Sequence, residues 1–362
     1  MKLEINTISG TNEKHKCYVH LRGASMGGGN LILTLQKLET TGIDTFHPLE
    51  VICSKDGGKT YTEPKEDGTF APFVENGVRY VPCDAYPQYH RKTGKVIVVG
   101  TFGAYSEDGF NHARSPETMS FYSVYSPDEG KFSPIKIIRK VSDTDYNCIS
   151  FGCVQFCEEE NGDILIPAAI AETKGVMSTV VLRFSFDGEI LTYKGKSNIL
   201  KKSDGRGLYE PSIIKCDRKY ILTMRNDNCA MYSVSDDGIE FSKPKLWIWD
   251  DGEVLPSYNT QAHFASLNDK PYLVYTRKGV NNDHVFRHRA PLLMAEIDVL
   301  NECIKKMTEI IVVPERGARL GNFGVINEDK NVVYVTTSEW MQPEGCEKYG
   351  SDNTSYVVKI SV

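Results

Sequence analysis

A glutamate and an arginine lie 15 residues apart in a stretch that is otherwise built largely from apolar residues. Glu210 belongs to "LYEPSII", directly after Tyr209, and Arg225 ends "YILTMR". If the two segments pair as neighbouring strands, the guanidinium lies beside the carboxylate and keeps it ionised. Such a carboxylate can act as a base, a nucleophile or an orienting group. We therefore assign Glu210 and Tyr209 as catalytic candidates.

Other arginines could bind an anion together with Arg225. They are Arg22 in "HLRGAS" and Arg287 and Arg289 in "DHVFRHRAP". Guanidinium groups bind a carboxylate through two parallel hydrogen bonds and stay charged at any working pH, so three of them could converge on one carboxylate. The alternative is that Arg225 and Arg289 only form ion pairs with nearby structural acids such as Asp227 and Asp283.

Histidines gather in two parts of the chain, before residue 113 and between residues 263 and 288. Histidine is the side chain best suited to proton transfer near neutral pH. We assign His263 and Asp84 to catalysis and expect His90 and His284 to bind the substrate. A metal site built from His90, His263 and His284 is an alternative, but it has no spacing motif. We expect no metal and no cofactor.

The remaining candidates would line the same site. Gln261 offers an amide to sugar hydroxyl groups, and Trp340 offers an aromatic face to a sugar ring. Glu172 ends an apolar segment and is expected at the same face of the molecule.

Four turns with a shared pattern indicate what positions these residues. The clearest is "SKDGGKTY", in which the Asp56 carboxylate can bond the N–H groups of its own turn and two glycines supply the positive φ of a tight hairpin. Looser copies begin at Ser126, Ser185 and Ser235, which gives about 60 residues per unit. This spacing is slightly above the typical range for a propeller blade of four strands, and the Asp56 turn is interpreted as scaffold.

Pairs of apolar runs repeat in each unit. Each second run follows a turn rich in Gly, Asp, Asn or Lys, as in a hairpin. These runs are 30–36, 95–102, 163–172, 220–225, 271–277 and 331–340. The sequence therefore predicts an all-β, six-bladed β-propeller that forms a single domain over residues 1–362. The first strand, "KLEINTI", is expected to pair with "SYVVKISV" and close the ring.

The propeller geometry places the candidates. The start of the innermost strand and the end of the next strand meet at one face beside the axis, where the Arg, His and carboxylate side chains gather. The Asp turns lie at the opposite face.

Composition limits the classes of partner. A net charge of −6 without a basic stripe excludes a nucleic-acid partner, and no apolar run reaches the roughly 18 residues of a membrane helix. Residues 1–30 contain no apolar core of a secretion signal, and the ten cysteines show no paired spacing. We expect a cytoplasmic protein without disulfides and without a membrane partner.

The turns, the pair "YEPSII" and "YILTMR", and the arginine that opens "RAPLLMAEID" resemble the sialidase (neuraminidase) superfamily and its BNR Asp-box repeat relatives over essentially the whole chain. The resemblance implies three arginines that clamp a substrate carboxylate, a Glu paired with a nucleophilic Tyr, and an Asp acid/base. Arg22, Arg225 and either Arg287 or Arg289 match the arginines, and Glu210 matches the Glu.

The sequence also departs from the family pattern. Phe323 stands where the family has its nucleophilic Tyr, and "RGA" replaces Arg-Ile-Pro at 22–24. The acid/base Asp has no clear match, with His47 and Asp84 nearest.

The expected function is that of a sialidase-like carbohydrate-active enzyme. The first hypothesis is an exo-acting glycoside hydrolase on an acidic sugar or oligosaccharide that bears a carboxylate. The alternatives are a propeller-type lyase acting on uronates, which would need a cation to stabilise an enolate, and a non-catalytic glycan-binding propeller.

Overall fold

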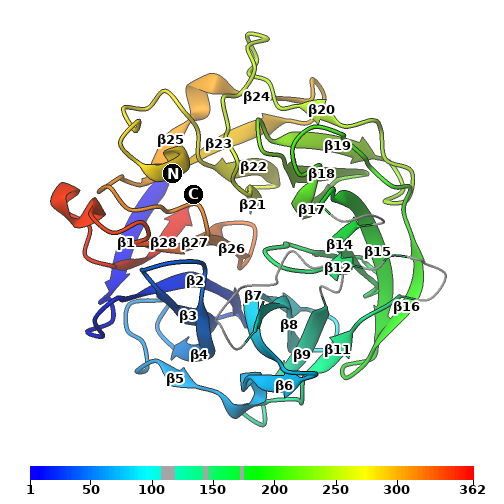
Figure 1. Cartoon of the computed structure of the whole chain (residues 1–362). Coiled ribbons are helices and arrows are strands. Elements are labelled where there is room, and N and C mark those ends of the chain that lie inside the picture. The colour runs from blue at the N-terminus through cyan, green and yellow to red at the C-terminus, as the bar shows by residue number, and fades with distance from the viewer. Residues whose placement is uncertain (107–118, 142–145, 147, 172–174) are drawn as a thin grey trace.

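The computed structural model describes residues 1–106, 119–141, 146, 148–171 and 175–362. Six antiparallel sheets surround one axis like blades (Figure 1). The predicted six-bladed, all-β propeller is therefore confirmed. All six predicted hairpin runs are strands, and the helices within the described ranges are single 3-10 turns.

Blade 1 contains β2 (Lys16–Ser25), β3 (Leu31–Glu39), β4 (Phe46–Ser54) and β5 (Lys65–Glu66). Blade 2 contains β6 (Phe73–Glu75), β7 (Val78–His90), β8 (Lys95–Tyr105), β9 (Ser120–Ser126), β10 (Lys131–Phe132) and β11 (Lys136–Ile138). Blade 3 contains β12 (Cys148–Ser150), β13 (Cys157–Glu158), β14 (Ile164–Ala171), β15 (Ser178–Phe186) and β16 (Leu191–Lys196).

Blade 4 contains β17 (Tyr209–Cys216), β18 (Lys219–Arg225), β19 (Met231–Ser235) and β20 (Lys245–Leu246). Blade 5 contains β21 (His263–Leu267), β22 (Lys270–Tyr275), β23 (Leu292–Asp298), β24 (Cys303–Ile304) and β25 (Ile310–Val313). Blade 6 contains β26 (Gly324–Asn327), β27 (Val332–Ser338), β28 (Ser355–Ser361) and β1 (Lys2–Ile8). The 3-10 turns are η1 (Gly68–Phe70), η2 (Phe286–His288), η3 (Lys306–Thr308) and η4 (Cys346–Tyr349).

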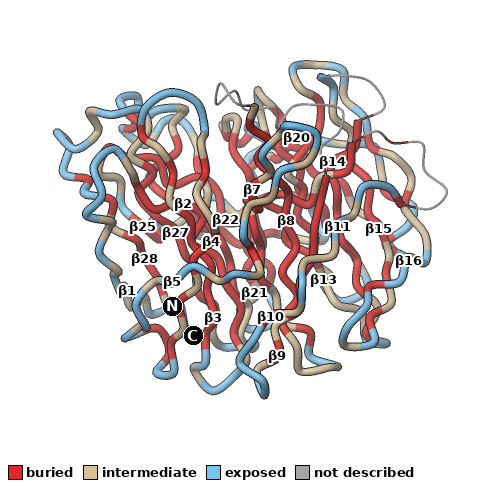
Figure 2. Tube along the Cα trace, turned by 60° about the horizontal axis from the view of Figure 1, so that its bottom comes forward, coloured by how far each residue is buried: buried red, intermediate tan, exposed pale blue. Residues whose placement is uncertain are grey.

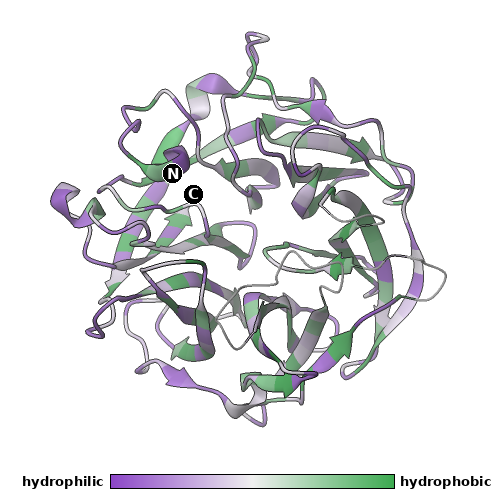
Figure 3. Cartoon of the chain, in the orientation of Figure 1, coloured by the Kyte–Doolittle hydropathy of each residue, from purple (hydrophilic) through white to green (hydrophobic). Residues whose placement is uncertain are grey.

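The hydrophobic core lies between the blades. Both faces of a blade are covered by its neighbours, so β14 is buried at every position and its sequence is a continuous apolar run. One cluster joins Ile97 and Val99 of blade 2 to Ile166 and Val180 of blade 3. Each such side chain contributes about 1.5–3 kcal/mol on burial. Figure 2 shows buried residues along the strands and exposed residues at the turns, and Figure 3 shows hydrophobic residues concentrated in the strands.

The ring closes between the two ends of the described chain. β1 pairs antiparallel with β28, with Lys2 opposite Ser361 and Ile8 opposite Ser355. The N-terminal strand is thus the outermost strand of blade 6, as the sequence predicted, and it covers an edge that would otherwise be open.

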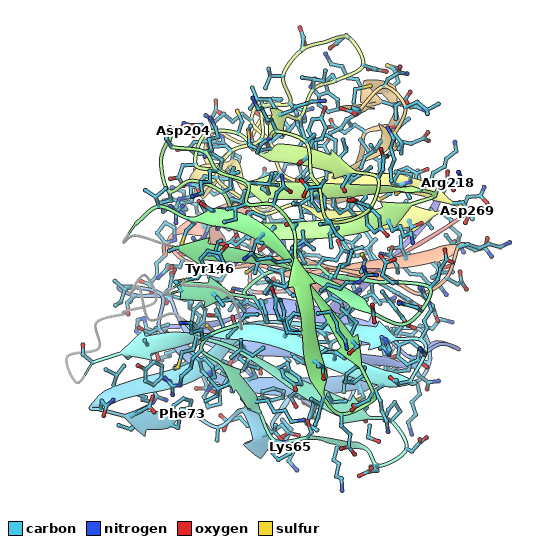
Figure 4. All side chains as sticks on the ribbon, turned by 90° about the vertical axis from the view of Figure 1, so that its right-hand side faces the viewer. Lys65, Phe73, Tyr146, Asp204, Arg218 and Asp269 are labelled. Carbon is cyan, nitrogen blue, oxygen red and sulfur yellow. The ribbon has the colours of Figure 1, made fainter. Side chains whose placement is uncertain are left out.

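The blades present two different faces. We call the face at which the inner hairpin turns lie the hairpin face, and the opposite face the mouth face. In Figure 4, Arg218 and Asp269, which lie in the β17–β18 and β21–β22 turns, appear on one side, and Asp204 and Tyr146 appear on the other. No helix among the described residues is long and apolar enough to cross a membrane.

The Asp56 turn is scaffold, as predicted. Asp56 Oδ1 accepts hydrogen bonds from the Lys59 and Thr60 N–H groups at 3.1 and 3.0 Å and from Ser54 Oγ at 2.8 Å. Asp237 repeats this arrangement with the N–H groups of residues 239 and 240. The looser copy at Ser126 is instead closed by a main-chain bond from Gly130 N to Ser126 O.

We expect Asp56→Ala to lower the melting temperature by a few degrees at neutral pH, because several donors lose their acceptor. Asp128→Ala is the matched control, since within the described residues no hydrogen bond to the Asp128 side chain is seen. Hydrogen bonds, first that of the Thr60 hydroxyl, lower the pKa of Asp56. Its contribution is therefore present above the pKa of an unfolded Asp and is lost as the pH falls through the folded pKa. Equal melting temperatures of the two variants in a thermal scan would contradict this account.

Candidate functional site

Irregularities in the inner strands place polar side chains at the axis. His20, Asp84 and Glu210 adopt positive φ values of 57°, 52° and 45°. Each lies at a register shift, in β2, β7 and β17 respectively. Cys153, before β13, has the same conformation with φ 61°. Positive φ is uncommon for these residue types and is concentrated at functional sites.

Contacts at the mouth face link one or more residues of every blade. We call these eight residues the axial ring: Glu210, Arg225, Asn259, Arg289, Asn322, His20, Asp84 and Cys153. Blades 4 and 5 supply its first half. Arg225 Nη1 donates to both Glu210 oxygens at 2.7 and 2.6 Å, and Arg225 Nη2 donates to Asn259 Oδ1 at 2.6 Å. Arg289 Nη2 donates to the main-chain carbonyl oxygen of Asn259 at 2.7 Å.

The second half of the axial ring crosses blades 6, 1, 2 and 3. Arg289 Nη1 donates to Asn322 Oδ1 at 3.3 Å, and Asn322 Nδ2 lies 2.8 Å from His20 Nε2. His20 Nε2 lies 3.3 Å from Asp84 Oδ1, which accepts a hydrogen bond from Cys153 Sγ at 3.0 Å. The contacts therefore run through all six blades and cross five of the boundaries between them.

Two carboxyl groups of the axial ring differ in proton affinity. Burial raises the pKa of Asp84 above its ordinary value, against the opposing charge of Arg22. Burial alone would also raise the pKa of Glu210, but the charge and hydrogen bonds of Arg225 outweigh it and lower that pKa. Both side chains are 24% exposed. Asp84 therefore holds its proton to a higher pH than an ordinary aspartate, and Glu210 loses its proton at a lower pH than an ordinary glutamate.

Arg289 is a buried arginine without an acidic partner in the described part of the chain. It is 3% exposed, its Nε has no hydrogen-bond partner, and no described carboxylate lies within 4.0 Å of it. Burial and the positive charges of Arg225 and Arg319 lower its pKa well below the ordinary value. The alternative that it only pairs with a nearby acid such as Asp283 is wrong, and Asp227 pairs with Arg206 rather than Arg225. An unpaired buried cation of this kind is suited to an anionic ligand.

Two further arginines of the mouth face lie near Arg289. The Arg319 guanidinium lies 4.2 Å from the Trp340 ring centroid and 5.1 Å from that of Phe286, and burial lowers its pKa to about 10. Arg287 is half-buried, and its guanidinium lies over the Phe286 ring. Neither forms an ion pair with a described carboxylate. Trp340 itself is 5% exposed, so it supports Arg319 rather than presenting its face to the mouth as expected.

Three expected site residues lie below the axial ring. Arg22 is fully buried and donates to the Phe323 carbonyl at 3.0 Å and to Cys153 Sγ at 3.2 Å, so its fork is not open to a ligand. Gln261 is 1% exposed and donates to the same carbonyl. His263 is fully buried and lies 2.7 Å from Ser212 Oγ. The expectation that these three face the mouth is corrected.

Phe323 belongs to this lower layer as well. Its ring packs at 4.9 Å from that of His263, with no exposed surface. Tyr209 lies nearer the axial ring, with its ring 4.8 Å below the Arg225 guanidinium, but its hydroxyl donates to Asp227 Oδ1 at 2.6 Å. Tyr209 therefore supports Arg225 while its hydroxyl is held by another acid.

Two histidines lie away from the axial ring. His90 ends β7 at the hairpin face, where Nε2 contacts the Gly162 carbonyl at 3.0 Å. His284 lies at the rim of the mouth face, 2.9 Å from Glu315, in a cavity of about 550 Å³ that is also lined by Tyr258, Phe286 and Arg287. His90, His263 and His284 are thus separated, which removes the alternative of a metal site shared by them. Glu172 and His112 lie outside the described residues.

Sequence reasoning missed His20, Cys153 and Asn259 as site residues. One signal was available, because His20, Asp84, Cys153 and Glu210 recur at intervals near the blade length, each two residues before a polar or aromatic side chain. Nothing in the composition of these segments indicates the bulges that turn them inward.

No protein-family model matches the chain, and no curated protein matches it. Among solved structures, a protein of unknown function from Dyadobacter fermentans is 16% identical over 99% of both chains, with a TM-score of 0.67. The Hadza microbial sialidase Hz136 is 11% identical over 94% of this chain, with a TM-score of 0.68, and a Trypanosoma rangeli sialidase is 14% identical over 98%, with a TM-score of 0.62.

This chain spans 65% and 57% of the lengths of those two sialidase chains. At such identities the likeness shows the fold, which is the six-bladed propeller fold of the sialidases. The resemblance in fold that the sequence indicated is confirmed.

Proposed function

We propose that the chain is a carbohydrate-active enzyme, an exo-acting glycoside hydrolase whose substrate is an acidic sugar. The observation that carries this proposal is the pair of carboxyl groups in the axial ring, Asp84 and Glu210, whose pKa values are shifted in opposite directions. Two carboxyl groups with such different environments are typical of an acid and a base or nucleophile in one site.

In this proposal Asp84 is the general acid. It gives its proton to the glycosidic oxygen as the bond from that oxygen to the sugar carbon breaks, and the bonding electrons go to the oxygen. Glu210, kept ionised by Arg225, stabilises the positive charge that develops on the sugar and either attacks its carbon or takes a proton from the attacking water. Phe323 has no hydroxyl, and the Tyr209 hydroxyl is bound to Asp227, so neither is assigned as the nucleophile.

Arg289 is the proposed binding group for the substrate carboxylate. Its lack of an acidic partner supports this role, and Arg319 and Arg287 add positive charge beside it. A structural neighbour, a Trypanosoma rangeli sialidase, was solved in complex with sialic acid, which is an acidic sugar. We also propose a cytoplasmic location, supported by the ten free thiols.

The test is incubation with a panel of acidic oligosaccharides, followed by analysis of product masses, reducing ends and ultraviolet absorbance. A saturated monosaccharide released from the chain end supports the exo-hydrolase. An unsaturated product identifies a uronate lyase instead. Binding without any product identifies a glycan-binding propeller. The absence of both binding and product overturns the proposal.

We expect Arg289→Lys to weaken binding of an acidic sugar by about tenfold or more, because lysine keeps the charge but loses the fork that binds two oxygens. Calorimetric titration of both forms checks this result. Arg277→Lys is the matched control, since Arg277 already pairs with Glu309 at 2.6 Å in the same blade. A neutral analogue should bind both Arg289 forms equally, and an unchanged affinity for the acidic sugar would refute the assignment.

A further inference from the structure

We infer that His20 is a positioning residue that favours the protonated form of Asp84, because the fixed amide of Asn322 leaves its only ring hydrogen on the nitrogen that faces away from Asp84. This role goes beyond the proposed pairing of an acid with a base. It rests on the proposed function in one respect, namely that the proton held by Asp84 is the one donated in the reaction. The arrangement of hydrogens follows from donors and acceptors whose roles are unambiguous.

The first amide fixes one side of the imidazole. The Arg289 guanidinium has only donors, and its Nη1 lies 3.3 Å from Asn322 Oδ1, so the carbonyl end of this amide faces Arg289. The NH₂ end therefore faces His20 Nε2, at 2.8 Å. An NH₂ group needs an acceptor, so Nε2 carries a lone pair and no hydrogen.

A second amide, that of Gln36, affects His20 from another part of blade 1. Gln36 Nε2 donates to the main-chain carbonyls of His47 and Pro82 at 2.6 and 2.8 Å, so its orientation is set by two acceptors. Burial and the charge of Arg22 lower the pKa of His20 well below its ordinary value, against a smaller opposing effect of Gln36, so the ring is neutral. Among the described residues, neither Gln36 Oε1 nor His20 Nδ1 has a hydrogen-bond partner. Because Nε2 accepts from Asn322 and carries no hydrogen, the one hydrogen of the neutral ring lies on Nδ1.

This tautomer of His20 disfavours the ionised form of Asp84. His20 Nε2 lies 3.3 Å from Asp84 Oδ1, but it has no hydrogen to offer, and its lone pair would face a negative carboxylate. A protonated Asp84 removes this repulsion. His20 is 1% exposed and its pKa lies well below the ordinary value, so it does not become a cation that would favour the carboxylate.

Other charged and titratable groups act on Asp84 from the surrounding strands. Arg22, at 4.0 Å in β2, favours ionisation, as does the hydrogen bond from Cys153. The charges of Glu210 and Asp44 favour the acid. The Cys153 thiol stays protonated because burial raises its pKa well above the ordinary value. Arg22 and Cys153 thus remain available to stabilise the carboxylate once the proton has been transferred.

The test is nitrogen-15 NMR of the histidine rings in the protein without substrate. We expect His20 to be neutral with hydrogen on Nδ1, and this signal to stay unchanged between about pH 5 and 8. Carbon-13 labelled aspartate, assigned by Asp84→Asn, should show that Asp84 loses its proton at a higher pH than the exposed aspartates of the same protein. Hydrogen on Nε2 of His20, or an Asp84 that ionises together with the exposed aspartates, overturns the inference. Both signals are read without turnover, so they stand apart from the proposed function.

Asn322→Asp is the variant that separates positioning from a merely structural role. Carboxylate oxygens in place of the NH₂ group oblige Nε2 to carry the hydrogen, so the His20 signal should change to the other tautomer and Asp84 should ionise at lower pH. Asn282→Asp is the matched control, because Asn282 bonds only main-chain carbonyls of blade 5 and should leave the His20 signal unchanged. If Asn322→Asp folds and the tautomer does not change, the inference fails. If it does not fold, the NMR measurements on the unaltered protein decide.

Discussion

Replacing Asp84 with asparagine is expected to slow hydrolysis of an acidic oligosaccharide by about 10²–10⁴-fold, the usual contribution of a positioned general acid. Asparagine keeps the shape of the side chain but has no proton to give to the leaving oxygen. An aryl glycoside of the same sugar, whose phenol leaves without protonation, should react at a rate within a few-fold of the unaltered protein. Comparison of the two substrates by steady-state kinetics measures the effect.

The pH dependence gives the same assignment a second test. The proposed hydrolysis requires protonated Asp84 and ionised Glu210. Its rate should therefore decrease when the pH is raised through the raised pKa of Asp84, and also when the pH is lowered through the lowered pKa of Glu210. Asp84→Asn should lose the alkaline limb and keep the acidic one. If both substrates slow equally, or if the alkaline limb persists, another group is the acid.

Replacing Glu210 with glutamine is expected to reduce turnover of both substrates by about 10²-fold or more, because the reaction then lacks the ionised carboxylate that stabilises charge or activates water. Glutamine nearly preserves the shape and can still accept a hydrogen bond from Arg225. Binding of the acidic sugar through Arg289 should persist, which calorimetric titration can show beside the kinetics.

Glu309→Gln is the control for the ion pair itself. Glu309 pairs with Arg277 at 2.6 Å and is 16% exposed, which resembles the Glu210–Arg225 pair in length and burial, but it lies outside the axial ring. Its loss should lower stability without reducing turnover of the folded protein. If Glu210→Gln behaves in the same way, with earlier unfolding and normal turnover, Glu210 is a structural residue.

The fold was predictable because each blade carries its own local signals. The apolar runs, the turns between them and the pairing of the first strand with the last are properties of short segments, and all of them appear in the structure. The contact between Glu210 and Arg225 was predictable for the same reason. β17 and β18 form a hairpin that places Tyr209, the neighbour of Glu210, opposite Arg225.

The wrong placement of His90 at the site arises from the length of the strand that it shares with Asp84. Asp84 and His90 share one segment, but six residues of an extended strand span about 20 Å. Within blade 2, Asp84 therefore lies at the mouth face of the propeller and His90 at the hairpin face. Placing His90 correctly required knowing that β7 runs through the blade to a hairpin turn after residue 90.

Burial of Arg22 depended on a distant residue. Gly324 lies against it, and a Cβ at that position would come within 2.9 Å of Arg22 Cγ. The absence of that side chain makes room for the arginine stem at the axis, where its head group is bound by main-chain carbonyls. Such complementarity between blades 1 and 6 is a property of the closed ring and cannot be seen in either segment alone.

The pairing of Lys2 with Ser361 has a practical consequence for protein engineering. The chain ends take the place of the outer turn of blade 6, on the side occupied by the Asp56 turn, so an affinity tag or a surface attachment at either end points away from the mouth face. A short peptide that joins these ends would convert the chain into a continuous circle, and new ends could then be opened at another outer turn without interrupting any residue of the axial ring.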